Sequence, residues 1–412
     1  MATELRILRP GEWDFWYDGI LRAFGAVGDK ERELHRELTE VGRSLGAWDG
    51  DRLVGSASLI SFRMTVPGGA LVSAAGLSMV HVASTHRRRG ILRSMMRRQL
   101  DETRAAGAEP LSVLTASEPH IYGRFGYGMA TRELHAEIDT GRVAFEPPPE
   151  SEGTRLRVVD DPASVMKECE AVYARRVPER PGMLERAPGW ERRPLLDIPE
   201  KRNGATPLAC VLAEDEHGEV RGYARYSLKN GWDEDDVPKG SVLLRDLEAL
   251  DTAAYGALWR FLWEIDLMPL LRVEARPVDD PWLHMTGDSV RLCRPRWRDG
   301  LFLRPVEVGA ALAARSYSAP VDVVLEVEDA FCPWNAGRWR LSGDSTGATC
   351  ERTGDAAELS LSVRELGAAY LGGTALRALA SAGRVRERRK GALGAASCAF
   401  STDVAPWLPH GF

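Results

Sequence analysis

A basic loop between a short apolar strand and an amphipathic helix carries the residues of this sequence best suited to chemistry. The strand lies at residues 80–82, and the loop and first helical turn contribute Arg87, Arg88, Arg89, Gly90, Ile91 and Leu92. The first N–H groups of a helix have no partner within it, the helix dipole adds positive charge, and glycine lets the backbone approach a ligand. A solvated surface turn is the alternative interpretation. We expect an anion site, and the diphosphate of coenzyme A is the predicted ligand.

A second stretch, at residues 117–128, is rich in aromatic residues and glycine and supplies a candidate acid. Transfer of an acetyl group from a thioester to an amine requires the departing thiolate to be protonated. A phenol with a pKa of about 10 is well matched to a thiol with a pKa of about 8.5. Tyr127 is therefore a candidate general acid, whereas core packing between turn glycines is the alternative for Tyr122, Phe125 and Tyr127.

His81 and Val82, on the strand before the loop, are candidates for two further roles. An imidazole titrates near neutral pH and suits a general base, so His81 is a candidate. The alternative is a purely structural histidine packed in the core. The backbone N–H of Val82 is expected to stabilise the oxyanion of the transition state. Val80 and Val82 are expected to pair with the pantetheine arm, and Ser117 is expected to contact the coenzyme.

Residues near the start of the chain are candidates for binding the acceptor. Phe24 is expected to supply an aromatic wall, and Asp29 is expected to supply negative charge for a cationic amine. An acidic residue at a helix start more often compensates the helix dipole, so this role of Asp29 competes with a purely structural one.

Length, charge and cysteine content bound the class of protein. The 412 residues predict two or three domains. A net charge of -6 argues against a nucleic-acid partner and is compatible with a cationic substrate. The six cysteines are scattered without a CxxC pair, which predicts a cytoplasmic protein without disulfides or a metal site. No apolar run reaches membrane-spanning length, so no membrane span is predicted.

The order of elements predicts an α/β (α+β) fold. Apolar residues at helical spacing predict helices at 11–25 and 31–41, and turn residues predict hairpins around 49–51 and 67–69. The strand, basic loop and helix follow, and then a buried strand at 111–114. This order of elements resembles that of an acetyltransferase domain.

The pattern restarts after three prolines at 147–149. A helix is predicted at 164–176, and Asp251 is predicted to cap another at 252–265. The Arg-x-x-Gly loop is missing before this second helix, so we predict a degenerate copy that does not hold coenzyme A. From residue 299, helices and a strand meander predict an α+β domain. The predicted domains are 1–145, 151–298 and 299–412.

The spacing Arg87-x-x-Gly90-x-Leu92 resembles the signature of the Gcn5-related N-acetyltransferases (GNAT superfamily), with Leu92 where that family usually has a small residue. Phe-Gly-Tyr at 125–127, preceded by Ile-Tyr-Gly-Arg at 121–124 and Ala-Ser-Glu at 116–118, is similar to the enhanced intracellular survival (Eis) family of aminoglycoside acetyltransferases. The runs at 66–68, 75–78, 85–93 and 370–373 and the terminal phenylalanine agree with that family as well.

The resemblance implies tandem GNAT domains, the second inactive, followed by a sterol-carrier-protein-like domain, in a homohexamer that uses acetyl-CoA. In the family, the tyrosine at the position of Tyr127 is the general acid, and the terminal carboxylate, here that of Phe412, is the general base. Gly411 stands where the family can carry an acidic residue, and His35 and Arg36 stand about where an aromatic wall is expected. The exact amine preference therefore stays open.

We accordingly expect an acetyl-CoA-dependent N-acetyltransferase that modifies amines of aminoglycoside-like polycationic small molecules by direct transfer. Polyamines or protein lysines are alternative acceptors. A non-catalytic scaffold whose last domain binds lipid or a partner is the alternative from another class of function.

Overall fold

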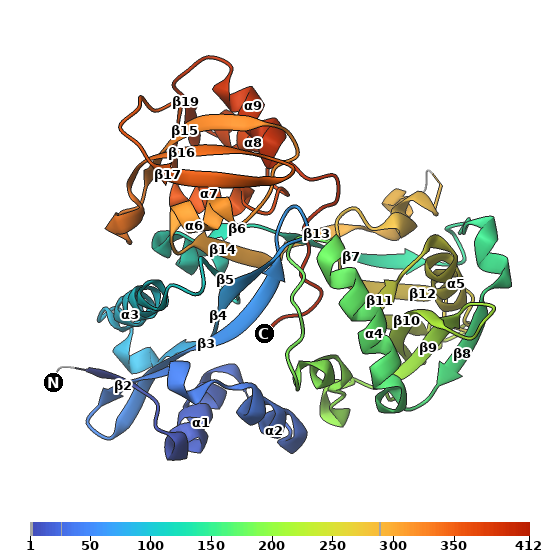
Figure 1. The fold of residues 1–412 in the computed structure, drawn as a ribbon. Coiled ribbons are helices and arrows are strands. Elements are labelled where there is room, and N and C mark those ends of the chain that lie inside the picture. The colour runs from blue at the N-terminus through green and yellow to red at the C-terminus, as the bar shows by residue number, and fades with distance from the viewer. Residues whose placement is uncertain (1–2, 26, 288–289) are drawn as a thin grey trace. The chain divides into compact units, whose positions relative to one another are not determined.

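The computed structural model describes residues 3–25, 27–287 and 290–412. The chain forms two compact units (Figure 1). One contains Met1–Thr131, Arg180–Glu185 and Asp299–Phe412, and the other contains Arg132–Glu179 and Arg186–Arg298. The two ends of the chain therefore fold together, whereas most of its middle folds separately.

A mixed sheet of seven strands in the order β1-β2-β3-β4-β5-β14-β6 supports the first unit. Its strands are β1 (Glu4–Ile7), β2 (Ser44–Asp49), β3 (Arg52–Thr65), β4 (Leu71–Val82), β5 (Leu111–Thr115), β14 (Leu301–Pro305) and β6 (Gly128–Met129). Helix α3 (Ile91–Ala106) packs on one face, and α1 (Trp13–Phe24) and α2 (Asp29–Leu38) lie on the other (Figure 1). The two predicted hairpins are confirmed, because β2–β3 and β3–β4 are antiparallel pairs.

A β-bulge changes the alternation of side chains along β4. Ser58 of β3 lies opposite Ser78, but Ser56 lies opposite His81, so one residue of β3 faces two of β4. Met79 within the bulge has a φ of 54°. The extra residue brings His81 onto the same face of the sheet as Ser78 and Gly76.

The second unit repeats this plan in a sheet of order β13-β7-β12-β11-β10-β9-β8. Its strands are β13 (Arg296–Asp299), β7 (Arg132–Asp139), β12 (Leu270–Arg276), β11 (Ser241–Ala249), β10 (Val220–Lys229), β9 (Ala209–Glu214) and β8 (Arg155–Val159), with helices α4 (Met166–Arg176) and α5 (Thr252–Trp263). The predicted cap is confirmed, since Asp251 accepts a hydrogen bond from the N–H of Ala254 at 2.9 Å. The carboxylate of Asp251 thus fills the helix N-terminus at which a bound anion would otherwise lie.

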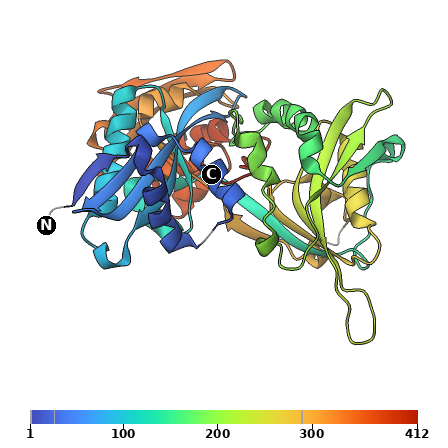
Figure 2. The ribbon, with the colours of Figure 1, turned by 90° about the horizontal axis from the view of Figure 1, so that it is seen from below.

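The last part of the chain forms a five-stranded sheet of order β17-β16-β15-β18-β19. Its strands are β17 (Gly347–Arg352), β16 (Gly337–Asp344), β15 (Val321–Glu328), β18 (Leu359–Ser362) and β19 (Val385–Glu387), and its helices are α6 (Val308–Ala313), α7 (Val363–Ala369), α8 (Leu376–Ser381) and α9 (Ala392–Phe400). The predicted α+β meander is confirmed. After α9 the chain runs back to the first sheet and ends beside β3 and β4 (Figures 1 and 2).

Strands are exchanged across the domain limits that the sequence suggests. β7 lies inside the predicted domain 1–145 yet pairs with β12 in the second sheet, and β14 lies inside the predicted domain 299–412 yet pairs with β5 in the first. Backbone pairing decides where an edge strand adds, and hydropathy does not reveal it. The limits 1–145, 151–298 and 299–412 remain our proposal for the domains, with these two strands contributed to neighbouring sheets.

Candidate active site

Strands β4 and β5 separate part of the way along their length. They pair in parallel only from Ala74 with Leu111 to Gly76 with Val113. Beyond that point β4 continues to Val82, bonded to β3 alone among the described residues. The backbone groups of residues 77–82 that face β5 are therefore open to a ligand that pairs like a strand. Val80 and Val82 lie on this open stretch.

The basic loop follows directly. His86 is buried, and its Nε2 lies 3.0 Å from Oδ2 of Asp49 while its Nδ1 lies 2.8 Å from Oγ1 of Thr85. This anchor leaves the next four residues exposed, with left-handed backbone at Arg88 (φ 62°) and Gly90 (φ 82°). No side chain caps α3 at Gly90. Within the described part of the chain, the three loop guanidiniums form no ion pair, so an uncapped helix start and three free cations coincide.

Tyr127 lies at the base of the gap between the two strands. Its hydroxyl is 2.7 Å from Oγ of Ser112, which in turn donates to the carbonyl of Ala75 at 3.1 Å. Ala75 and Ser112 form the pair next to the last one that joins β4 and β5. Tyr127 is 1% exposed, and burial raises the pKa of its hydroxyl. The phenol is therefore protonated at neutral pH, as a general acid must be.

A buried ion pair fixes the turn that carries Tyr127. Arg304 of β14 donates to the carbonyl of Phe125 and to the carboxylate of Asp329, and both charged side chains are buried. The space left by Gly126 (φ 84°) is filled by the Arg304 guanidinium, so a side chain at that position would collide with it.

The chain's own C-terminus reaches the opposite face of the same strands. The ring of Phe412 lies 4.8 Å from that of Phe62 of β3, and its Cε2 lies 3.0 Å from where a Cβ of Gly76 would stand. Gly411 lies against Thr115, the last residue of β5. The last two residues are thus held near the point where β4 and β5 part, and not at a frayed end.

Residues 180–185 hold this tail in place. The N–H of Thr65 at the end of β3 donates to Met183, while the N–H of Trp407 donates to Pro181, both at 2.9 Å. Arg180 Nη1 donates to the carbonyl of Ala405 at 2.6 Å. The segment therefore ties β3 to the tail.

His81 shares a face with Phe412. Burial, followed by the charge of Arg87, lowers the pKa of its imidazole, so the ring is neutral at neutral pH. Its Nδ1 is buried and has no hydrogen-bond partner among the described residues. His81 and Phe412 thus lie on one side of the gap and Tyr127 on the other, because Tyr127 packs with the α3 face.

The remaining predicted residues lie at more exposed positions. Ser117 is exposed, two residues after β5 ends. Phe24 ends α1 with 60% of its surface exposed, and Asp29 begins α2. Their roles in binding stay predictions.

Sequence reasoning missed three contributors: Ser112, the Arg304–Asp329 pair and the segment 180–185. A hydroxyl within the apolar strand 111–114 and an arginine within the apolar strand 301–305 are signals in the sequence. The segment 180–185 offers none, since only pairing in three dimensions identifies it.

Comparisons with known proteins agree with this architecture. Residues 4–130 and 182–305 each match an acetyltransferase (GNAT) domain family, and residues 308–409 match the sterol carrier protein domain family. The N-acetyltransferase Eis of Mycobacterium tuberculosis is 36% identical over 87% of this chain and 86% of its own. The chain belongs to the Eis family of N-acetyltransferases.

Two further proteins are similar to this chain over its whole length. The crystal structure of Eis1 from Mycobacterium abscessus superposes with a TM-score of 0.83 at 33% identity, covering all of both chains. An uncharacterized N-acetyltransferase of Streptomyces avermitilis is 60% identical over the full length of both chains. The chain is thus an N-acetyltransferase with two GNAT domains and a sterol-carrier-protein-like domain, as predicted.

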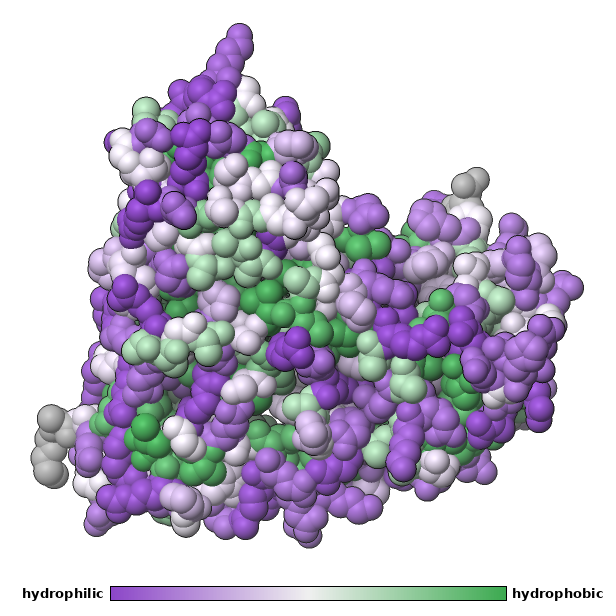
Figure 3. All heavy atoms as spheres, in the orientation of Figure 1, coloured by the Kyte–Doolittle hydropathy of each residue, from purple (hydrophilic) through white to green (hydrophobic). Residues whose placement is uncertain are grey.

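Neither the hydropathy of the face drawn in Figure 3 nor the helices of this Eis-family protein indicate a membrane span among the described residues. On the face drawn in Figure 3, hydrophilic side chains predominate and apolar ones lie between them in patches. Among the described residues, no helix combines the length and the apolar character that crossing a membrane would need.

Proposed function

We propose that this chain acetylates primary amines of polycationic small molecules, aminoglycosides first, with acetyl-CoA as the donor. The observation that carries the proposal is the gap between β4 and β5, with a buried phenol on one face and the last residue of the chain, Phe412, on the other. GNAT acetyltransferases in general use acetyl-CoA, and the resemblance to the Eis family implies the acceptor class.

The residues around the gap fit acetyl-CoA. Arg87, Arg88 and Arg89 and the N–H groups at Gly90, Ile91 and Leu92 would bind the diphosphate, because they combine free positive charge with an uncapped helix start. The open edge of β4 at Val80 and Val82 would pair with the amides of the pantetheine arm. Ser117 would contact the coenzyme beyond β5.

In the proposed transfer, the free amine of the acceptor attacks the thioester carbon. The oxyanion that forms accepts a hydrogen bond from the N–H of Val82. When the C–S bond breaks, Tyr127 donates its proton to the sulfur. The Ser112 hydroxyl, which donates to the carbonyl of Ala75 before the reaction, would turn its single proton to the phenolate left behind. The nitrogen loses its extra proton to the base on the other face.

The proposed base is the carboxylate of Phe412, with His81 as its rival. A carboxylate of pKa about 3.5 is a weak base, but it takes the proton directly or through water once the amine is bound. His81 is neutral and so has the required protonation state. Phe24 and Asp29, on the helices of this face, are the proposed aromatic and anionic contacts of the acceptor.

We also propose a cytoplasmic homohexamer. The location is supported by six free cysteines, five of them buried. The assembly is supported by the family resemblance, and light scattering coupled to size exclusion tests it: six times 45.4 kDa is expected, and a monomeric mass contradicts it.

A thiol-release assay with acetyl-CoA and kanamycin tests the function. Tyr127→Phe should abolish release, whereas Tyr122→Phe, on the neighbouring ring, should not. To identify the base, Phe412 is deleted in one variant and His81 is replaced by Ala in another. The change that lowers kcat more has removed the base. Absence of turnover with kanamycin, but turnover with spermidine or a lysine peptide, would reassign the acceptor.

A further inference from the structure

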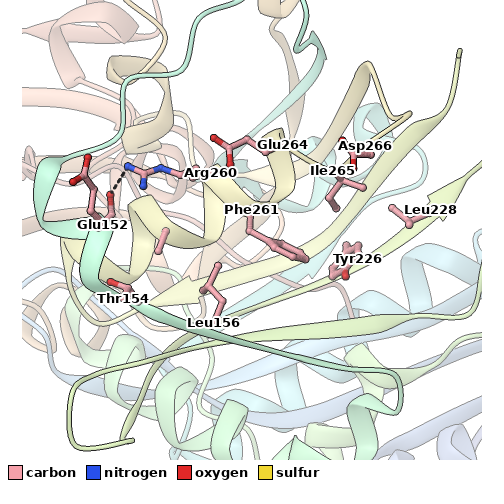
Figure 4. A pocket seen from close by; sticks show the side chains of 12 residues that line it. Glu152, Thr154, Leu156, Tyr226, Leu228, Arg260, Phe261, Glu264, Ile265 and Asp266 are labelled. Atoms are coloured by element: carbon pink, nitrogen blue, oxygen red, sulfur yellow. Dashed lines mark hydrogen bonds between the residues drawn. The ribbon is translucent and has the colours of Figure 1, made fainter. Parts of the chain in front are cut away.

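The second unit contains a pocket apart from the residues assigned to acetyl transfer. Its volume is about 490 Å³, within the usual range for small-ligand sites. The start of β8, the end of β10 and the last turn of α5 enclose it (Figure 4). Its walls are Leu156, Tyr226 and Phe261, and the two rings lie edge to face with centroids 5.6 Å apart.

The charged groups of this pocket are mainly acidic. Glu152, Glu264 and Asp266 line it, against the single guanidinium of Arg260. Arg260 donates to Oγ of Ser151. Among the described residues, no ion pair or hydrogen bond engages the three carboxylates, which are exposed, so only solvent balances their charge.

Two of the carboxylates stand where the helix itself disfavours them. Glu264 is the C-cap of α5, and Asp266 follows two residues later. The C-terminal end of a helix carries partial negative charge, so acids there are unfavourable unless a cation is nearby. A positive charge bound in the pocket would therefore be favoured over a neutral group.

A tyrosine side chain without a hydrogen-bond partner is a second, independent feature of this pocket. Tyr226 is 6% exposed and lines the pocket, yet its hydroxyl has no hydrogen-bond partner in the part of the chain that the structure describes. The hydroxyl itself still reaches solvent, although the rest of the side chain is buried, so a ligand in the pocket would replace water as its partner.

We propose that this pocket binds an amphipathic amine, with its ammonium at Glu264 and Asp266 and its apolar body against Phe261 and Tyr226. An aromatic or alkyl body fits the ring walls, which also attract a cation through their faces. The site is a second amine site in the domain that lacks the coenzyme loop. It depends on no step of the proposed acetyl transfer.

Tryptamine and its neutral counterpart tryptophol test the proposal by calorimetric titration of the full-length protein. Tryptamine should bind at least tenfold more tightly than tryptophol. Glu264→Gln and Asp266→Asn should each weaken the binding of tryptamine about two- to fivefold, as expected for an exposed ion pair. Glu274→Gln, an exposed carboxylate on β12 outside the pocket, is the matched control and should change nothing.

Hydrogen exchange separates this pocket from the acceptor site, where tryptamine is also able to bind. Protection of the amides at 260–266 in the wild type, lost in Glu264→Gln, supports the proposal. Equal binding of both compounds, or protection confined to the first domain, would overturn it. Tyr226→Phe keeps the packing and removes only the hydroxyl. This variant should fold even if the Glu264 and Asp266 variants do not.

Discussion

Replacing Gly76 by alanine tests whether the position of the C-terminus matters for catalysis. A Cβ at this position would stand 2.5 Å from Phe62 Cδ2 and 3.0 Å from Phe412 Cε2. Carbon atoms in contact are about 3.5–4.0 Å apart. The Phe62 ring must therefore retreat by about 1 Å and the Phe412 ring by at least about half an ångström.

The expected cost follows from these displacements. Misplacing a reacting group by about 1 Å lowers the rate by about 100-fold, so we expect kcat for kanamycin to fall by about 10- to 100-fold. Overpacking also lowers the free energy of unfolding by about 1–3 kcal/mol. Thiol release measures kcat, and urea denaturation measures stability.

Two further variants make the test specific. Gly42→Ala, in the same domain with no atom within 4 Å of the new methyl group, should leave both quantities unchanged. Phe62→Leu, added to Gly76→Ala, should recover part of the lost kcat by making room for Phe412. If Gly76→Ala loses stability but turns over at the wild-type rate, the tail takes no part in the reaction.

Three other perturbations test separate parts of the site. Asp329→Asn breaks the buried pair with Arg304 and should lower the free energy of unfolding, measured in urea, by about 3–5 kcal/mol. Asp322→Asn, at an exposed ion pair, is the control and should lower it by less than about 1 kcal/mol. Equal losses would contradict the role of the buried pair. Burial lowers the pKa of His81 in the folded chain, so the imidazole stays neutral there. In the unfolded chain the same imidazole takes up a proton below about pH 6.5. The free energy of unfolding should therefore decrease as the pH falls below that value. His81→Gln should flatten this loss between pH 7.5 and 5.5, and an unchanged slope would refute it. Arg180→Ala should free the tail and make it more sensitive to carboxypeptidase; unaltered digestion would mean that other contacts hold it.

Local patterns in the sequence were enough to predict the elements of the site. The apolar strand, the Arg-x-x-Gly spacing and the helical repeat after it predict the loop, because each depends on neighbouring residues alone. The turn glycines of residues 117–128 are local in the same way, whereas the choice of Tyr127 as the acid relied on the family resemblance and stays a prediction. The cap of α5 by Asp251 was predictable for the same reason.

Pairings between distant segments were not predictable. β7 and β14 have the hydropathy of ordinary strands, and nothing in that pattern states that each adds to a neighbouring sheet. The partner of Tyr127 depends on the register of Ala75 with Ser112. The position of Phe412 near the gap came from family resemblance, and the contacts of residues 180–185 that hold the tail became visible only in the structure.

A crystal structure with bound coenzyme A and an aminoglycoside is the most direct test of the central claim. We expect the diphosphate at the start of α3, the pantetheine arm along Val80 and Val82, and the sulfur within hydrogen-bond reach of Tyr127. The acceptor nitrogen should lie between that sulfur and the carboxylate of Phe412. A coenzyme bound elsewhere, or a tail withdrawn from the gap when both ligands are present, would contradict that claim.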